Sequence, residues 1–291
     1  MNAVVTGAGG QLGQEVVRCL KNEARMHVVG FTRKEWDVTE PDQTKRLLNQ
    51  AKPDVIIHCA AYTQVDESES DPELAYAVNG EATRHLAVEC ARRGIRLVYI
   101  STDYVFDGHK EEGYTETDLP NPLNHYGKSK RLGEKWVMEH CPDHLILRTS
   151  WLYGIGGTNF PLAILKKAEA NQPLAVVFDQ VGSPTYTGHL AEKVKQFLFS
   201  SARGIFHVAN QGRCSWYDFA VEICRLAGFD VKIEPISSAD LARKAMRPAC
   251  SVLKSEKMEK WGIPPMPHWK EGLVQFLKEW REFNRDRRGR L

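Results

Sequence analysis

The stretch Thr6-Gly7-Ala8-Gly9-Gly10-Gln11-Leu12-Gly13 decides the fold, because it follows a short apolar run and opens a segment with helical spacing. Its glycines have the spacing G-x-x-G-x-x-G. Gly7 permits a tight turn, Gly10 lets the backbone approach a pyrophosphate, and Gly13 lets the helix pack close to the strand. Free backbone N–H groups and the helix dipole favour an anion there. The stretch therefore predicts a dinucleotide-binding turn, with an ordinary glycine-rich turn as the alternative.

Strands and helices alternate after that turn. The apolar runs predict strands at residues 3–5, 27–31, 55–58, 97–100 and 144–148, and the helical spacing predicts helices at 11–20, 41–51, 72–93 and 124–140. Strands separated by helices indicate crossover connections and a parallel sheet. Short, continuously apolar strands are typical of a sheet that is covered on both faces.

The pattern loosens after about residue 150. Helices are expected at residues 159–170, 216–227 and 269–283, and short strands at 174–178, 204–208 and 231–235. We predict an α/β protein with a Rossmann-type, doubly wound parallel sheet and a smaller C-terminal α/β lobe. Residues 1–150 would form the dinucleotide-binding domain, with later segments returning to it, and residues 151–291 would form mainly a substrate-binding lobe.

Composition limits the class of protein. The chain has 291 residues, of which 42% are hydrophobic and 26% charged, and its formal net charge is +2. This balance is ordinary for a globular protein and favours neither a nucleic-acid nor a membrane partner. The seven cysteines contain no C-x-x-C pair, and the N-terminus lacks a signal-peptide pattern, so we expect reduced thiols and a cytoplasmic location. The arginines of the tail, at 281, 285, 287, 288 and 290, could be solvated or could contact a phosphate or a partner.

The second predicted strand bears on the choice of cofactor. It ends in Gly30-Phe31-Thr32-Arg33-Lys34, without the Asp or Glu that binds the ribose 2′-OH of NAD. Arg33 could instead pair with a 2′-phosphate, although it could also be a solvated loop cation. NADPH is therefore the expected cofactor, with NADH as the alternative.

Tyr126, Lys130 and Thr102 are the predicted catalytic residues. Tyr126 and Lys130 have the spacing Y-x-x-x-K at the start of a predicted helix, and Thr102 follows a predicted strand. The spacing places the phenol and the ammonium on one helix face. We expect Lys130 to lower the pKa of Tyr126, so that the phenol can protonate a carbonyl oxygen while Thr102 donates a hydrogen bond to the same oxygen. The alternative is a surface Tyr and Lys on an amphipathic helix.

Several further stretches, together with the residues above, resemble the extended short-chain dehydrogenase/reductase family. They are Gly10-Gln11-Leu12-Gly13, residues 59–66 (CAAYTQVD), 101–106 (STDYVF), 122–130 (PLNHYGKSK), 148–153 (RTSWLY), 179–185 (DQVGSPT), and Arg247-Pro248. The likeness covers nearly the whole chain. It is strongest to the branch that reduces the 4-keto group of dTDP-4-dehydro-L-rhamnose to give dTDP-L-rhamnose.

The resemblance implies roles for further residues. Cofactor contacts would come from Gly7, Gly10, Gln11, Leu12, Gly13, Arg33, Asp37, Val38, Ala61, Tyr62, Thr63, Tyr126 and Lys130. Thr102, Asp103 and Trp151 would meet the sugar of a dTDP-sugar substrate, and Arg247 its diphosphate. Trp151 could instead be core packing, Arg247 a surface ion pair and Asp103 a loop cap.

The resemblance leaves other functions open. Dehydratases of the family carry Asp-Glu after the threonine, whereas Asp103 is followed here by Tyr104, a poor base that favours plain carbonyl reduction. Glu15 matches a position where family members can hold Mg²⁺, but a lone glutamate does not justify predicting a metal. The alternatives are another nucleotide-sugar 4-keto reductase or epimerase, or a non-catalytic NADP-binding regulatory subunit like the β subunit of methionine adenosyltransferase. A monomer or a homodimer is expected.

Overall fold

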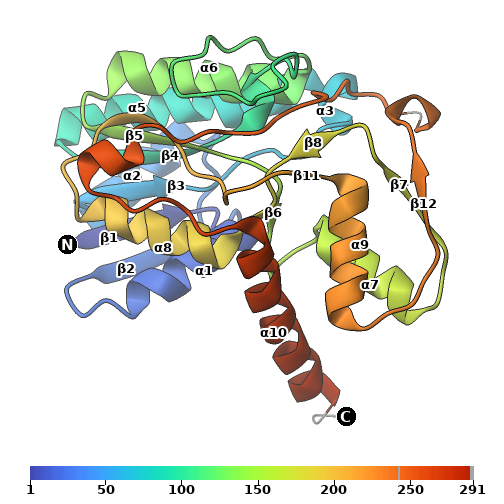
Figure 1. Cartoon of the computed structure of the whole chain (residues 1–291). Coiled ribbons are helices and arrows are strands. Elements are labelled where there is room, and N and C mark those ends of the chain that lie inside the picture. The colour runs from blue at the N-terminus through green and yellow to red at the C-terminus, as the bar shows by residue number, and fades with distance from the viewer. Residues whose placement is uncertain (242, 289–291) are drawn as a thin grey trace.

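A parallel sheet forms the centre of the computed structural model, which describes residues 1–241 and 243–288 and side chains up to residue 285 (Figure 1). Within these residues the sheet has six strands in the order β10-β5-β4-β3-β1-β2. The strands are β1 (Asn2–Thr6), β2 (His27–Phe31), β3 (Val55–His58), β4 (Arg96–Thr102), β5 (His144–Thr149) and β10 (Gly204–His207). Arg290, and the side chains of Arg287 and Arg288 in the tail, lie outside the described part.

The strand order reverses direction next to β1. This strand pairs with β2 on one side and with β3 on the other, in parallel register. The crevice at such a reversal, outside the carboxyl ends of the strands, is where open α/β sheets bind ligands. The glycine turn that follows β1 lies at this point, so the fold places the predicted dinucleotide turn where a ligand would bind.

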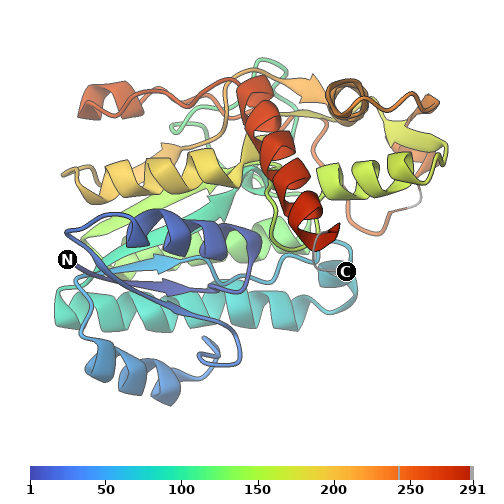
Figure 2. The same cartoon turned by 90° about the horizontal axis from the view of Figure 1, so that it is seen from below.

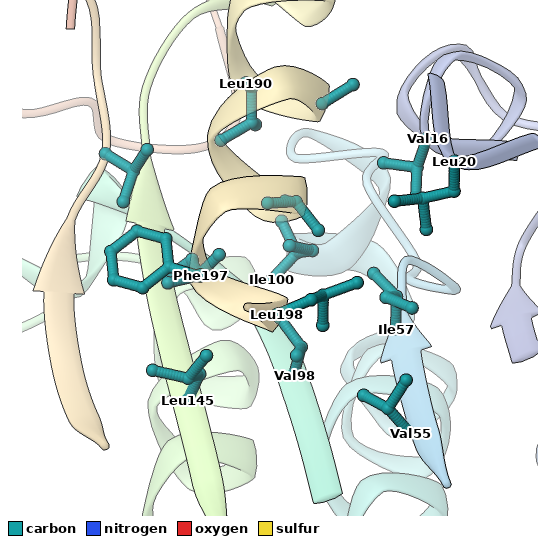
Figure 3. Close-up of a cluster of buried hydrophobic side chains, with 14 of the residues drawn as sticks. Val16, Leu20, Val55, Ile57, Val98, Ile100, Leu145, Leu190, Phe197 and Leu198 are labelled. Carbon is teal, nitrogen blue, oxygen red and sulfur yellow. The ribbon is translucent and has the colours of Figure 1, made fainter. Parts of the chain in front are cut away.

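One face of the sheet is covered by α1 (Gln11–Lys21) and α8 (Thr187–Leu198), as Figure 3 shows. Alternate strand residues face these helices, because successive side chains of a strand point to opposite faces. Val55 and Ile57, for example, share a cluster with Leu20 and Phe197. Each fully buried aliphatic side chain of this kind contributes about 1.5–3 kcal/mol to stability.

The opposite face is covered by α2 (Pro41–Ala51), α5 (Ala82–Arg93) and α6 (His125–His140). Ile56, which lies between Val55 and Ile57 in β3, packs here with Leu86 and Val137. Both faces of the strands are thus buried between helices, and Figure 2 shows the layers from a second direction. The predicted doubly wound fold class is confirmed.

A smaller lobe lies beyond the carboxyl edge of the sheet, on the right of Figure 1. Its buried cluster joins Ile164, Phe219 and Phe276, which lie on three different helices. The helices are α7 (Phe160–Glu169), α9 (Trp216–Ala227) and α10 (Trp269–Arg288), and the strands are β7 (Leu174–Val177) and β12 (Ile233–Ile236). Shorter elements connect the lobe to the sheet: β6 (Leu152–Tyr153), β8 (Val181–Gly182), β9 (Thr185–Tyr186), β11 (Cys214–Ser215), η3 (Ser238–Asp240) and η4 (Met258–Trp261).

Two elements differ from the sequence predictions. Helix α8 was not predicted, although Leu190, Val194 and Phe197 repeat at helical spacing and are fully buried. The single helix predicted for residues 72–93 is instead α4 (Pro72–Tyr76), a π-helical segment η1 (Ala77–Glu81) and α5. The short α3 (Glu67–Ser70) precedes them, and η2 (Asp103–Val105) follows β4. Among the described helices, none combines the length and apolar character needed to cross a lipid bilayer.

Candidate active site

Two adjoining cavities open along the carboxyl edge of the sheet. The larger, of about 400 Å³, contains Thr102, Tyr126 and Lys130, and we call it the reaction end. The smaller, of about 220 Å³, contains Arg33 and Asp37, and we call it the adenosine end. Gly7, Gly10, Cys59 and Ala61 line both cavities, so the two ends form one groove that meets at the glycine turn.

The residues predicted to contact a cofactor all line this groove. Gln11, Leu12, Gly13, Thr63, Tyr126 and Lys130 lie at the reaction end, Arg33, Asp37, Val38 and Tyr62 at the adenosine end, and Gly7, Gly10 and Ala61 at both. They come from the turn after β1, the segment after β2, the loop after β3, and α6. Residues far apart in the sequence are thus brought to one elongated site.

The glycine turn leaves no room for a side chain at Gly7 or Gly13. Gly7 has φ of 67°, and a Cβ there would lie 2.6 Å from the amide nitrogen of Ala60. A Cβ on Gly13 would lie 2.2 Å from the carbonyl oxygen of Gly7. The turn can therefore fold back against α1 and the loop after β3 only with glycine at both positions, which leaves its backbone open to a phosphate.

The adenosine end has an open, weakly charged rim. Arg33 is exposed and lines the cavity, as does Asp37, whose carboxylate accepts hydrogen bonds from Thr39 N at 3.0 Å and Oγ1 at 2.7 Å. An acid also reaches the tip of β2, which the sequence prediction did not include. The Glu35 carboxylate folds back to accept hydrogen bonds from Thr32 N at 2.8 Å and Oγ1 at 2.7 Å. The Glu35 carboxylate is thus bound by Thr32, and Glu35 does not line the groove.

Close packing at the start of α6 brings Tyr126 beside Thr102. Asn124 caps the helix by accepting a hydrogen bond from Gly127 N at 2.8 Å. A Cβ on Gly127 would lie 2.1 Å from the carbonyl oxygen of Tyr104, so glycine lets the first turn of α6 approach η2. The rings of Tyr104 and Tyr126 then meet edge to face, with centroids 5.8 Å apart. The phenol of Tyr126 lies in the reaction end with its hydroxyl near Thr102.

Lys130 is buried one helical turn further along α6. A second glycine, Gly133, permits the approach, because a Cβ there would lie 2.3 Å from the hydroxyl of Tyr99. The Lys130 ammonium donates a hydrogen bond to the carbonyl of Ile100 at 2.7 Å and lies 4.1 Å from the centroid of the Tyr99 ring. Burial lowers the pKa of Lys130 to about 7, because the charged form loses water.

The expectation that Lys130 lowers the pKa of Tyr126 is wrong for the chain by itself. Burial raises the pKa of Tyr126 above its usual value, and the nearby Thr102 side chain offsets only part of that rise. Lys130 is not among the causes of the shift. The phenol is therefore protonated at neutral pH, which is the state that a proton donor requires.

Asp103 is a buried carboxyl that lines the reaction end. Its Oδ1 accepts a hydrogen bond from Thr102 Oγ1 at 3.0 Å. Burial raises the pKa of Asp103 to about 7, while the nearby Ser251 side chain and the hydrogen bond from Thr102 oppose the rise. Near neutral pH the side chain can thus accept a hydrogen bond as a carboxylate or donate one as an acid.

Of the two other predicted substrate residues, Trp151 lies in the groove and Arg247 does not. Trp151 lines the reaction end and stacks on Trp216, with ring centroids 3.5 Å apart and planes 4° apart. Arg247 lines neither cavity of the groove. It forms a two-pronged ion pair with Asp66 at 3.0 and 2.8 Å. The ion pair that the sequence left open for Arg247 is therefore present.

Sequence reasoning missed Asn79, which holds together two walls of the groove. Its side chain accepts a hydrogen bond from Tyr62 N at 2.9 Å and donates to Tyr62 O at 3.0 Å. It also donates to Ser129 Oγ on α6 at 2.9 Å. The available signal was Asn79-Gly80 in the middle of a predicted helix, where both residues are poor helix formers.

Glu15, the position considered for Mg²⁺, accepts hydrogen bonds from Arg18, which also reaches Glu279 at 3.3 Å. In the described residues no group of three or more His, Cys, Asp or Glu side chains is arranged to hold a metal ion. The contacts of Glu15 are therefore those of a surface ion pair.

Comparison with known proteins identifies relatives along the whole chain. The family model described as RmlD substrate binding domain matches residues 1–282. The spore coat polysaccharide biosynthesis protein SpsK of Bacillus subtilis is 44% identical over 95% of this chain and 96% of its own length. The dTDP-4-keto-6-deoxy-D-glucose reductase of Streptomyces niveus is 38% identical over 94% of this chain and 95% of its own.

A solved structure agrees with these matches. The dTDP-4-dehydrorhamnose reductase of Bacillus anthracis, in complex with NADP, is 39% identical, has a TM-score of 0.92, and covers 96% of this chain and 99% of its own. The resemblance that the sequence motifs predicted is confirmed. The glycine turn at the reversal of strand order and the groove along the sheet edge agree with this match. The chain belongs to the family described as RmlD substrate binding domain.

Proposed function

We propose that this chain reduces the 4-keto group of dTDP-4-dehydro-L-rhamnose with NADPH and so forms dTDP-L-rhamnose. The observation that carries the proposal is the reaction end of the groove, where Thr102, Tyr126 and Lys130 lie together beside the glycine turn. Membership of a family that contains named dTDP-4-keto-sugar reductases supports the reaction class. The chain is an oxidoreductase of dTDP-4-keto sugars, and the L-rhamnose product is the specific claim.

The chain's own residues would protonate the substrate's carbonyl oxygen and stabilise the negative charge that develops on it. When bound, the reduced nicotinamide supplies a hydride to the carbonyl carbon. Tyr126 is protonated and would give its proton to the carbonyl oxygen. Thr102 would donate a hydrogen bond to the same atom by giving up the hydrogen bond that it donates to Asp103. Lys130, buried at the floor of the cavity, would hold positive charge near the site where negative charge develops on oxygen.

The glycine turn and Arg33 support NADPH. Glycine at positions 7 and 13 lets the turn pack against neighbouring backbone, where a Cβ would clash, and the turn opens α1, whose first N–H groups suit a pyrophosphate. Arg33 would pair with the 2′-phosphate, whereas Glu35 already accepts two hydrogen bonds from Thr32. The relative from Bacillus anthracis was solved with NADP, which agrees with this choice. NADH remains a weaker alternative.

Substrate contacts would come from both sides of the reaction end. Asp103 would bind a sugar hydroxyl, and the Trp151 ring, held flat against Trp216, would cover the sugar. Arg247 would meet the diphosphate only by exchanging part of its pairing with Asp66. The sugar itself is the least constrained part, because the relative from Streptomyces niveus is named for a 6-deoxy-D-glucose derivative.

One assay tests the proposal. Purified protein is mixed with NADPH and dTDP-4-dehydro-L-rhamnose, and nicotinamide absorbance is followed while the product is identified by mass and NMR. Oxidation with dTDP-L-rhamnose as product supports the proposal. Faster turnover of dTDP-4-keto-6-deoxy-D-glucose would assign another sugar, and cofactor binding without turnover of either would indicate the regulatory alternative. NADH in a parallel reaction measures the cofactor preference.

The state of the protein in the cell is also a proposal. We infer a cytoplasmic protein, supported by seven free cysteines among the described residues. We propose a monomer or homodimer, and we assign no Mg²⁺ to Glu15, which already pairs with Arg18. Light scattering with Mg²⁺ and with EDTA would test both points, since a mass that changes with the metal contradicts the proposal.

A further inference from the structure

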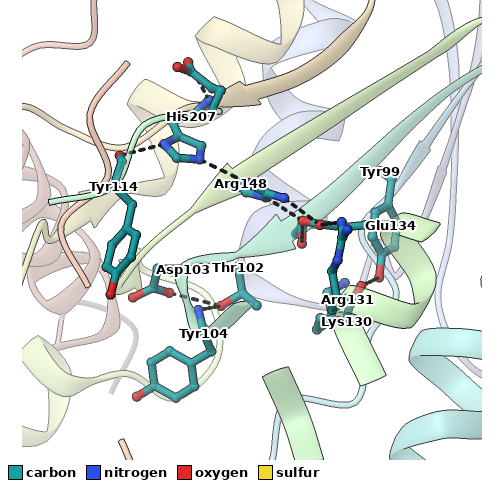
Figure 4. A network of polar contacts seen from close by, with 12 residues as sticks. Tyr99, Thr102, Asp103, Tyr104, Tyr114, Lys130, Arg131, Glu134, Arg148 and His207 are labelled. Atoms are coloured by element: carbon teal, nitrogen blue, oxygen red, sulfur yellow. Dashed lines mark hydrogen bonds and ion pairs between the residues drawn. The ribbon is translucent and has the colours of Figure 1, made fainter. Parts of the chain in front are cut away.

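A buried ion pair lies one helical turn from Lys130. Glu134 follows Lys130 by four residues on α6, so the two side chains lie on the same face of the helix. The Glu134 carboxylate pairs with Arg148 of β5 through two hydrogen bonds, at 2.7 Å from Nε and 2.8 Å from Nη2 (Figure 4). Glu134 is 0% and Arg148 1% exposed. Removing one member of such a pair leaves the other as an uncompensated buried charge.

The ion pair connects three of the elements that line the reaction end. Glu134 accepts a hydrogen bond from Ser101 Oγ of β4 at 2.7 Å, and Ser101 precedes Thr102. Arg148 precedes Thr149, which lines the same cavity. The carboxylate thus ties α6, with its phenol and ammonium, to the ends of β4 and β5. Its fourth hydrogen bond, at 2.9 Å, comes from Arg131, which is 33% exposed.

Three other titratable groups near Lys130 are neutral near pH 7. His58 of β3 has its pKa lowered to about 3 by burial, and burial raises the pKa of Cys59 to about 12. Burial also raises the pKa of Tyr99 of β4 above its usual value. Glu134 instead has a lowered pKa, because its hydrogen bonds and cationic partners outweigh its burial. In the part of the chain described by the structure, Glu134 is the anion that acts on Lys130.

Cations surround the same carboxylate. Arg148 is buried beside it, and Arg131 reaches it from the surface. Without the carboxylate, Lys130 and Arg148 would be two cations in a dry interior with no counter-charge between them. Lys130 would then lose its proton, because an arginine remains charged while a buried lysine can become neutral.

We propose that Glu134, oriented by Arg148, is a positioning residue that keeps the Lys130 ammonium protonated at the reaction end. The proposal rests on the proposed function in one respect, which is that the charge of Lys130 serves the reduction. Glu134 itself does not line the cavity. It acts through Lys130 and through the fixed ends of β4 and β5.

The test removes the negative charge of the Glu134 side chain and keeps the shape of that side chain. In Glu134→Gln, the titration of Lys130 should move to lower pH by at least about one unit, since Glu134 lies one helical turn from Lys130 and a nearby opposite charge shifts a pKa by about 1–3 units. Lysine labelled with ¹³C at Cε, assigned with Lys130→Met, reports this titration by NMR. Because activity needs the charged form, kcat/KM falls as pH rises through this pKa, so that fall should also begin at lower pH.

Arg131→Gln is the matched control, because it removes a cation from the same carboxylate at its exposed side. It should move the Lys130 titration slightly to higher pH, opposite to Glu134→Gln. If Glu134→Gln does not fold, the test uses Arg131→Gln and Arg131→Glu. The pH at which Lys130 titrates should then be higher in Arg131→Gln than in the wild type, and higher still in Arg131→Glu. An unchanged titration in the folded variants, or shifts of one sign in Glu134→Gln and Arg131→Gln, overturns the proposal.

The NMR titration needs neither cofactor nor substrate. A wild-type protein that does not oxidise NADPH would therefore remove the proposed function and leave this measurement intact. An active wild type whose Lys130 titrates identically in Glu134→Gln would remove only the role of Glu134. A loss of activity at every pH with an unmoved titration would indicate structural damage and would also overturn the proposal.

Discussion

The two ends of the groove are built in opposite ways. At the reaction end the polar groups are buried: Thr102 is 7%, Asp103 3% and Lys130 3% exposed. At the adenosine end Arg33 is exposed, and the wall shared with the reaction end is formed by Gly7, Gly10, Cys59 and Ala61. Burial shifts the pKa of Asp103 and of Lys130 to about 7, whereas hydrogen bonds from Thr39 lower the pKa of Asp37 at the open end.

This difference indicates a division of work along the groove. In an interior with little water each charge or hydrogen bond has a larger interaction energy. Groups that titrate near neutral pH, such as those of the reaction end, are suited to proton transfer. The open end needs only shape and a favourable backbone to hold phosphates, since exposed charges are screened by solvent and salt. Substitutions should therefore act on turnover at one end and on cofactor affinity at the other.

The largest expected effect is at the reaction end. Tyr126→Phe removes the proton donor and should lower kcat by at least about 100-fold, the usual contribution of a general acid. The Kd of NADPH should change little, because the ring that lines the cavity remains. Stopped-flow hydride transfer and NADPH fluorescence titration measure the two quantities. Tyr217→Phe, which removes a hydroxyl on α9 outside the groove, is the control, and equal losses in both variants would contradict the role of Tyr126.

The sequence was sufficient for what is local. The glycine turn, the flanking strand and α1 follow from the spacing of Gly7, Gly10 and Gly13, and the strand positions follow from apolar runs. The π-helical segment was not predictable in the same way. It contains Asn79, whose side-chain hydrogen-bond partners Tyr62 and Ser129 lie 17 and 50 residues away.

The electrostatics of the site could be predicted only in part. The spacing of Tyr126 and Lys130 gave their shared helix face, but the direction of the Tyr126 pKa shift depends on how deeply the phenol is buried, which is a tertiary property. Arg247 illustrates the same limit, because its partner Asp66 lies 181 residues away. Residue types and spacing give candidates, and packing decides what each candidate faces.

The next largest effect concerns the turn between the two ends. Gly13→Ala places a methyl group 2.2 Å from the Gly7 carbonyl oxygen, which is rigid backbone. Overpacking of this kind costs about 1–3 kcal/mol of unfolding free energy, and the displaced turn should bind NADPH more weakly. Urea denaturation and NADPH titration measure both losses. Gly9→Ala is the control for stability, because its methyl group would meet only the Thr32 side chain at 3.5 Å; equal destabilisation in both would refute the packing argument.

The smallest effect is expected at the adenosine end. Arg33→Ser removes one exposed cation that lines the cavity and should raise the Kd of NADPH about tenfold, corresponding to a loss of about 1.4 kcal/mol. The Kd of NADH should hardly change, because NADH has no 2′-phosphate for Arg33 to pair with. Lys34→Ser, next to Arg33 but outside the cavity lining, controls for loss of general positive charge. The loss in Arg33→Ser should shrink at high salt, since the pair is exposed to solvent. An equal rise in the Kd of NADPH and of NADH would show that Arg33 does not pair with the 2′-phosphate. The open end would then discriminate between the two cofactors by shape alone.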